Sequence, residues 1–140
     1  MDKMYKYKVQ GHEKPGPDSM MECRECTCFN LRKAARVVTQ IFDNAMRPIN
    51  LRATQFTLLA LASVHGPITV TRLSEEIVAD RTTLSRNLNP MEKSGLIRIE
   101  PGDDRRTRIV VITDSGKTKL EEAYPLWKKA QQEIKDAMGT

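Results

Sequence analysis

The chain has 140 residues, enough for one domain with a single hydrophobic core. Its 23 lysines and arginines against 18 aspartates and glutamates give a net charge of +5, a mild basic excess that suits an anionic partner. No stretch approaches the roughly 18 continuous apolar residues of a membrane span, and the polar N-terminus lacks a signal-peptide core. We therefore expect a cytoplasmic protein that does not enter a membrane.

Residues 1–22 match no helical or strand pattern. The segment carries little apolar surface, and glycine or proline interrupts it at Gly11, Pro15, Gly16 and Pro17. A segment of this composition cannot bury enough surface to fold alone. We expect a flexible arm that moves freely or lies along a partner subunit.

Three cysteines with the spacing Cys-x-x-Cys-x-Cys follow the arm, at Cys23, Cys26 and Cys28. They lie at the expected start of the first helix, where the helix dipole and nearby basic residues favour the thiolate form. Zinc normally takes four ligands, and neither His12 nor His65 is spaced to complete such a set. We therefore expect no metal site, and a reducing cytosol disfavours a permanent disulfide.

Two segments with apolar residues at helical spacing come next. Phe29–Met46 carries an apolar stripe, and Pro48 should stop this helix. Ala53–Val64 is more uniformly apolar, which predicts a second helix near the centre of the fold, ended by Gly66. Ile68 would then supply a short strand.

A helix-turn-helix pattern follows. Thr69 can cap a helix over Thr69–Ile77, whose apolar residues fall at i, i+3 and i+7. Asp80 can cap a second helix, Arg81–Lys93, after a link of about three residues. Pro90 removes one backbone donor from this second helix, so we expect a bend there but not an end.

The Arg81–Lys93 helix has one apolar and one polar side. With about 100° between successive residues, Leu84, Leu88 and Met91 share the apolar side. The polar side carries Thr82, Ser85, Arg86, Asn89 and Lys93. Arginine and asparagine can make bidentate bonds to guanine and adenine edges, and serine and threonine can bond bases or phosphates. The alternative is an ordinary solvated helix face.

A basic β-hairpin follows Gly95, which supplies a helix stop. Leu96–Glu100 alternates in polarity as a strand does. Thr107–Thr113 is rich in β-branched residues, which favour strands. The tip and the return strand carry three arginines, Arg105, Arg106 and Arg108. Their guanidinium groups would be attracted to phosphates or to a narrow minor groove, and Asp104 could hold one of them in a bidentate ion pair. The alternative is a solvated charged turn.

After the hairpin, Asp114 or Ser115 can cap a long helix that Pro125 should kink or divide.

The order of these elements resembles the MarR family of bacterial transcriptional regulators over about residues 28–138. Its most specific pieces are Asp80–Leu88, Met91–Ile97 and Asp103–Arg106. The resemblance implies a mostly α (α+β) fold in a single domain at 23–140. This domain would hold a winged helix-turn-helix at 53–113, flanked by dimerisation helices at 29–47 and 114–138.

For function, the resemblance implies a homodimeric regulator, most simply a repressor, that binds double-stranded DNA at a pseudo-palindromic operator. The second helix would enter the major groove, and Arg106, matched with Asp104, would reach into the minor groove. The residues expected at the DNA are Arg81, Thr82, Thr83, Ser85, Arg86, Asn89, Asp104, Arg105, Arg106 and Arg108. The arm could also contact DNA through Lys3, Lys6, Lys8 and Lys14, and the dimer could be anchored by Leu120 and Trp127.

A narrower resemblance concerns Cys28, whose surroundings are similar to those of the reactive cysteine in the organic-hydroperoxide repressors (OhrR) of this family. The tyrosines that bond that sulfur correspond here to Arg32 and Phe42, and phenylalanine cannot donate a hydrogen bond. The hypothesis is that Cys28, with Cys23 or Cys26 as resolving thiol, senses oxidants and weakens DNA binding. The alternative is that Cys28 is a small buried hydrophobe.

The family also binds aromatic ligands between the dimer helices and the winged domain. Here such a ligand would contact Phe42, Met46, Phe56 and Leu59, which core packing explains as well. No Ser/His/Asp set, phosphate loop or paired-carboxylate signature is present, so we expect neither an enzyme nor a cofactor. A redox or metal sensor of the same fold and a winged-helix protein-interaction module are the alternative functions.

Overall fold

The computed structural model describes residues 16–139. The chain divides into two compact units, Met1–Val37 and Val38–Thr140. Helix α2, Thr27–Met46, begins in the first unit and ends in the second. The arm lysines for which a DNA contact is predicted lie outside the described residues.

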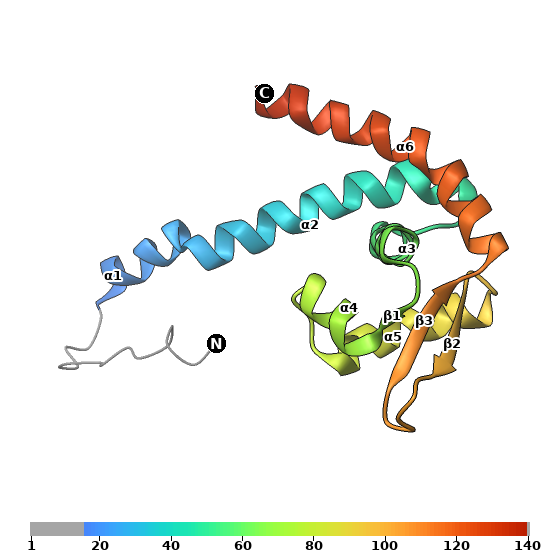
Figure 1. The fold of residues 1–140 in the computed structure, drawn as a ribbon. Coiled ribbons are helices and arrows are strands. Elements are labelled where there is room, and N and C mark those ends of the chain that lie inside the picture. Colours follow the sequence, from blue (N-terminus) through green and yellow to red (C-terminus); the bar gives the residue numbers. More distant parts are fainter. Residues whose placement is uncertain (1–15, 140) are drawn as a thin grey trace. The chain divides into compact units, whose positions relative to one another are not determined.

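In the first unit, a short helix and a 3-10 turn precede α2 (Figure 1). Helix α1 spans Pro17–Met21 and the turn η1 spans Glu22–Glu25. The Asn30 side chain donates to the carbonyl oxygens of Arg24 and Cys26, at 2.9 and 3.1 Å, and so ties η1 to the start of α2. The prediction that no element forms before residue 23 is wrong from Pro17 onward, because proline at the first helical position favours a helix start.

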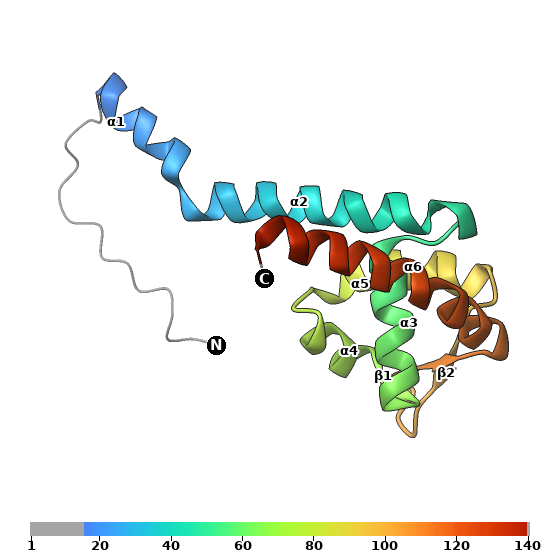
Figure 2. The same ribbon diagram turned by 90° about the horizontal axis from the view of Figure 1, so that it is seen from above.

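Helix α3, Ala53–His65, lies at the centre of the second unit. The end of α2 and a 3-10 turn, η2, at Arg47–Ile49 lead into it. Its main contacts are with α5 (Arg81–Lys93), β3 (Arg108–Ile112) and α6 (Asp114–Met138). Figure 1 looks down α3 with α5 and the strands below it, and Figure 2 shows it from the side. Its buried residues are Phe56, Leu58, Leu59 and Ala62. The prediction of a central apolar helix is confirmed.

The predicted helix-turn-helix is confirmed. Helix α4 spans Val70–Glu76, and the Thr69 hydroxyl caps it by accepting the Arg72 N–H at 3.1 Å. Helix α5 begins and ends at the predicted residues and continues through Pro90. Pro90 removes one backbone hydrogen bond, but the burial of the apolar side chains of α5 keeps the helix intact.

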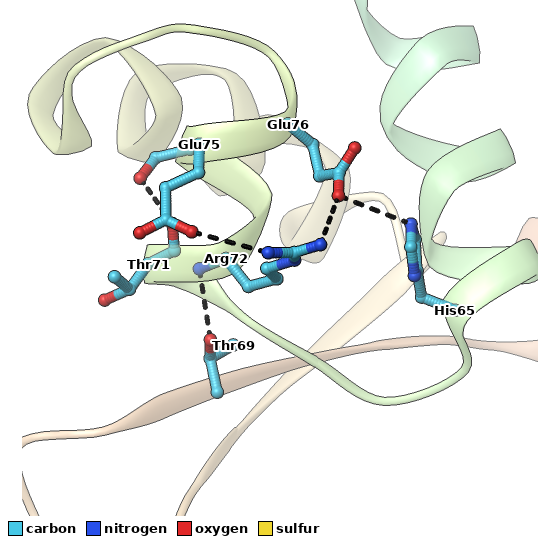
Figure 3. A network of polar contacts seen from close by, with 7 residues as sticks. His65, Thr69, Thr71, Arg72, Glu75 and Glu76 are labelled. Atoms are coloured by element: carbon cyan, nitrogen blue, oxygen red, sulfur yellow. Dashed lines mark hydrogen bonds and ion pairs between the residues drawn. The ribbon is translucent and has the colours of Figure 1, made fainter. Parts of the chain in front are cut away.

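Polar contacts hold α4 near the end of α3 (Figure 3). Arg72 Nη2 lies 3.0 Å from Glu76 Oε1, and Arg72 Nη1 lies 3.8 Å from Glu75 Oε2. Glu76 Oε1 is also 4.0 Å from Nε2 of His65, the last residue of α3. Ion pairs this exposed add little stability one by one.

Three strands form the wing sheet, in the order β1-β3-β2. Strands β1 (Ile68–Thr69) and β2 (Ile97–Pro101) both pair antiparallel with β3. Ile68 lies opposite Val110, and Ile97 lies opposite Ile112. The hairpin and the short strand at Ile68 are confirmed, and residues 102–107 form the turn at the tip of the wing.

Thr113 joins the wing to α6. Its hydroxyl donates to the Gly95 carbonyl oxygen at 2.5 Å and accepts the Gly116 N–H at 3.0 Å. The prediction of Asp114 or Ser115 as the cap is wrong, because Thr113 has the extended backbone of a cap residue and Asp114 is already helical.

Helix α6 runs through Pro125 without dividing. Its Trp127 ring stacks on Phe56 of α3, with the ring centroids 5.8 Å apart, and Leu120 also packs against the core. Both Trp127 and Leu120, expected at a dimer interface, therefore pack against the core of their own chain.

Val78, in the turn between α4 and α5, has a left-handed backbone with φ of 51°, although it is β-branched and 82% exposed. Because asparagine tolerates this conformation and little buried area is lost, we predict that Val78→Asn raises the free energy of unfolding by about 1 kcal/mol. Urea unfolding measures the change. Val64→Asn is the control, since Val64 is equally exposed at 82% within α3. An equal change in both variants would contradict backbone strain at Val78.

Candidate nucleic-acid interface

Helix α5 turns its polar side outward because its apolar side is buried. Leu84, Leu88 and Met91 are at most 2% exposed. The predicted contact residues Arg81, Thr82, Thr83, Arg86 and Asn89 are exposed, and Ser85 is half-buried. The separation into two sides that the helical period predicts is confirmed.

Asp80 fixes the start of α5. Its Oδ1 accepts the Thr83 N–H at 2.8 Å, and its Oδ2 accepts the Thr83 hydroxyl at 2.8 Å. The bond from the Thr83 backbone N–H has the largest effect on the pKa of Asp80, and the bond from the Thr83 hydroxyl adds to it. Together they lower this pKa below its ordinary value of 3.8. The Thr83 hydroxyl hydrogen, predicted to be available to DNA, is thus committed to the cap.

Arg81, the first residue of α5, is held by a residue that no sequence motif indicates. Its Nη2 donates to Oγ1 of Thr71 on α4 at 2.8 Å. The bond joins the two helices of the helix-turn-helix and orients the guanidinium group. Thr71 and Arg81 belong to different elements, so only the fold brings them together.

The turn at the wing tip is closed by two hydrogen bonds that Asp104 accepts from backbone N–H groups. Asp104 Oδ1 accepts the Arg106 N–H at 3.1 Å, and the Asp104 carbonyl oxygen accepts the Thr107 N–H at 2.8 Å. The predicted ion pair between Asp104 and a wing arginine is wrong, because this carboxylate closes the turn instead. In the described part of the chain, Arg105, Arg106 and Arg108 make no ion pair, and all three are exposed.

A hollow of about 360 Å³ lies between the helix-turn-helix and the wing. This basic hollow is lined by Thr69, Val70, Thr71, Arg81, Ser85, Arg106, Thr107 and Arg108. Three of these residues are arginines, and none carries a negative charge. A concave surface with one sign of charge concentrates counter-ions, so the basic hollow favours an anionic ligand.

All three cysteines are exposed and free. Cys23 and Cys26 are one 3-10 turn apart, with the Cys26 N–H donating to the Cys23 carbonyl oxygen at 3.2 Å. In the single chain the Cys28 side chain is exposed, on an exposed stretch of α2. Between residues 16 and 139, no group of three His, Cys, Asp or Glu side chains is placed to hold a metal ion.

The residues expected around an aromatic ligand lie in or against the core. Met46 and Leu59 are fully buried, Phe56 is 9% exposed, and Phe42 packs against the buried cluster. Core packing therefore accounts for all four side chains.

A helix-turn-helix followed by a three-stranded wing, with a basic hollow between them, defines a winged-helix DNA-binding protein. The sequence model of the MarR family matches residues 51–107. The M. tuberculosis transcriptional regulator MosR, solved in complex with DNA, is 40% identical, with a TM-score of 0.75. That match covers 79% of this chain and 81% of MosR. The chain belongs to the MarR family.

Two further relatives agree with this assignment. The organic hydroperoxide resistance transcriptional regulator of Bacillus subtilis is 29% identical over 107 residues, which are 76% of this chain and 73% of that protein. A mutant of E. coli MarR solved with operator DNA has a TM-score of 0.76 over 84% of this chain and 86% of its own, and at 19% identity it shows the shared fold. MosR and the B. subtilis protein are transcriptional regulators. As a member of the same family, this chain is a transcriptional regulator and not an enzyme. No helix among the described residues is long and apolar enough to cross a membrane.

We predict that Asp80→Asn lowers the thermal stability of the protein near pH 7, because the amide loses the charge while it keeps one acceptor for Thr83. The folded-state pKa of Asp80 is lowered, so the stabilisation by its carboxylate is present above pH 3.8 and is lost as the pH falls below it. The difference in Tm between the wild type and Asp80→Asn should therefore shrink as the pH falls below 3.8. A difference that does not change with pH would contradict this account of the cap.

Proposed function

We propose that the protein is a homodimeric repressor that binds an operator in double-stranded DNA and is released by a small molecule or an oxidant. The observation that carries the proposal is that Arg81 and Ser85 of α5 line the same basic hollow as Arg106 and Arg108 of the wing. One interface can thus engage both grooves of a duplex. The MosR structure in complex with DNA, at 40% identity, supports this use of the fold. Such a regulator acts at the chromosome, so we place it in the cytoplasm.

We assign base reading to the outer side of α5. Arg86 and Asn89 are exposed there and can make bidentate bonds to guanine and adenine edges in the major groove. Thr82 and Ser85 flank them and suit bases or phosphates. Arg106 is the wing residue that we assign to the minor groove, with Arg105 and Arg108 on the adjoining backbone. Asp104 acts by closing the turn that presents Arg106.

We assign dimer formation to residues 29–47 and 114–138. Large apolar side chains are exposed along these segments in the single chain. Phe29 is 56% and Leu31 65% exposed on α2, and Tyr124 is 54% and Met138 72% exposed on α6. Such side chains favour burial against a second copy. A two-fold dimer would place the two copies of α5 in successive major grooves, with half-sites about 10 base pairs apart.

The test begins with an operator recovered by selection from fragments of the host genome. We predict that Arg86→Ala weakens binding to this operator by about 1–3 kcal/mol and relaxes the preference at one base pair per half-site. Arg106→Ala should also weaken binding. The slope of log affinity against log salt concentration should fall by about 1 for each phosphate that loses its cationic partner on the wing.

Arg98→Ala is the matched control for both variants. Arg98 is also an exposed arginine of the wing sheet, but it is paired with Glu100 at 2.9 Å. Its removal should leave operator affinity and salt dependence unchanged. Equal affinity of the wild type, Arg86→Ala and Arg106→Ala for the operator would refute the proposal. No binding to promoter DNA even at low salt would favour a protein-interaction module.

An oxidant signal is favoured over other signals by the exposure of all three thiols. In this scheme the Cys28 thiolate attacks a hydroperoxide, the O–O bond breaks, and sulfenic acid and an alcohol are formed. The thiol of Cys23 or Cys26 then displaces water from the sulfenic sulfur and leaves a disulfide.

We predict that an organic hydroperoxide lowers operator affinity of the wild type at least tenfold and that dithiothreitol restores it. Cys28→Ser should bind the operator as tightly as the wild type and should not respond to the peroxide. Gel-shift titrations before and after treatment measure both. Operator binding by the wild type that peroxide leaves unchanged would remove the oxidant signal and leave the DNA-binding proposal intact.

A further inference from the structure

The basic hollow joins three elements that are separate in the sequence. Thr69, Val70 and Thr71 come from the start of α4, Arg81 and Ser85 from the start of α5, and the remaining lining residues from the wing. No single helix end therefore makes this site. The site exists only when the helix-turn-helix and the wing are folded together.

The chemistry of the lining selects an anion with several oxygens. Arg81, Arg106 and Arg108 supply guanidinium donors, and Thr71, Ser85 and Thr107 supply hydroxyl groups. Guanidinium groups bind phosphate oxygens through two parallel N–H donors and remain charged at all relevant pH values. No lining carboxylate competes with such a ligand.

Arg81 is oriented by the protein itself. Its Nη2 donates to Thr71 Oγ1 at 2.8 Å, which fixes one side of the guanidinium group and leaves its other donors for a ligand. The Thr71 hydroxyl accepts this bond through its oxygen, so its own hydrogen can still be donated. Thr71 thus acts both as a positioning residue for Arg81 and as a donor to the ligand.

The position of the basic hollow identifies the phosphate. In a duplex, one sugar–phosphate strand separates the major groove from the adjacent minor groove. If α5 enters the major groove and the wing enters the minor groove, that strand must pass between them, across the basic hollow. We propose that the basic hollow seats one backbone phosphate of each operator half-site, held by Arg81, Thr71 and Arg108. This inference rests on the proposed function, because it presumes that α5 and the wing flank the same strand.

The test uses a series of operator duplexes, each with one phosphate replaced by a neutral methylphosphonate. At one position per half-site, the methylphosphonate should lower the affinity of the wild type about tenfold or more. This position lies between the bases protected by α5 and the minor groove at the wing. Arg81→Gln and Thr71→Val should bind the unmodified operator more weakly and should no longer distinguish this methylphosphonate from the normal phosphate. The salt slope of Arg81→Gln should fall by about 1.

Two further variants separate a direct role from general damage. Thr71→Ser keeps the hydroxyl and should respond to the methylphosphonate as the wild type does. Arg86→Ala removes a base-reading side chain and should keep the full phosphate effect. If the wild type binds the operator but no methylphosphonate position is coupled to Arg81 or Thr71, the phosphate seat is wrong and DNA binding stands. If the wild type binds no operator at all, both the seat and the proposed function are overturned.

Discussion

The burial of Leu84, Leu88 and Met91 is the constraint on which the DNA-facing surface depends. Helix α5 can rotate about its axis only by exposing these side chains, and burial of one such side chain contributes on the order of 1.5–3 kcal/mol. The helical period then places Arg86 and Asn89 outward. The Asp80 cap fixes the residue at which the helix begins. Rotation and starting point together set which side chains can reach a groove.

The wing is tied to the same helix and the same core. Glu92, near the end of α5, accepts the N–H of Ile99 in β2 through Oε1 at 3.2 Å. Thr113 bonds the turn after α5 at Gly95 and caps α6 with the same hydroxyl. The bond from Arg81 to Thr71 adds α4 to this assembly. A change in the position of α6 would therefore reach both the wing and the end of α5.

The elements that the sequence predicts well are those whose signals are local. The caps at Thr69 and Asp80 and the apolar period of α5 act over a few residues, and the structure has them as expected. The predictions that are wrong or missing concern which of two neighbouring residues takes a role, or which residues of different elements come into contact. Thr113 is the cap of α6 because its hydroxyl also meets Gly95, eighteen residues away. The sequence makes an ion pair of Asp104 equally plausible, but its carboxylate accepts a backbone N–H instead. Thr71 can bond Arg81 only because the fold brings α4 and α5 together. The proposed release signal has no comparable local pattern beyond the three exposed cysteines.

The central claim is that α5 and the wing occupy adjacent grooves of one operator. Dimethyl sulfate tests it directly, because the reagent methylates guanine N7 in the major groove and adenine N3 in the minor groove. In each half-site the wild type should protect guanine N7 under α5 and adenine N3 under the wing, about half a helical turn away. Arg106→Ala should restore methylation of the adenine while the guanine stays protected. Protection confined to one groove, or an Arg106→Ala pattern identical to that of the wild type, would contradict the account.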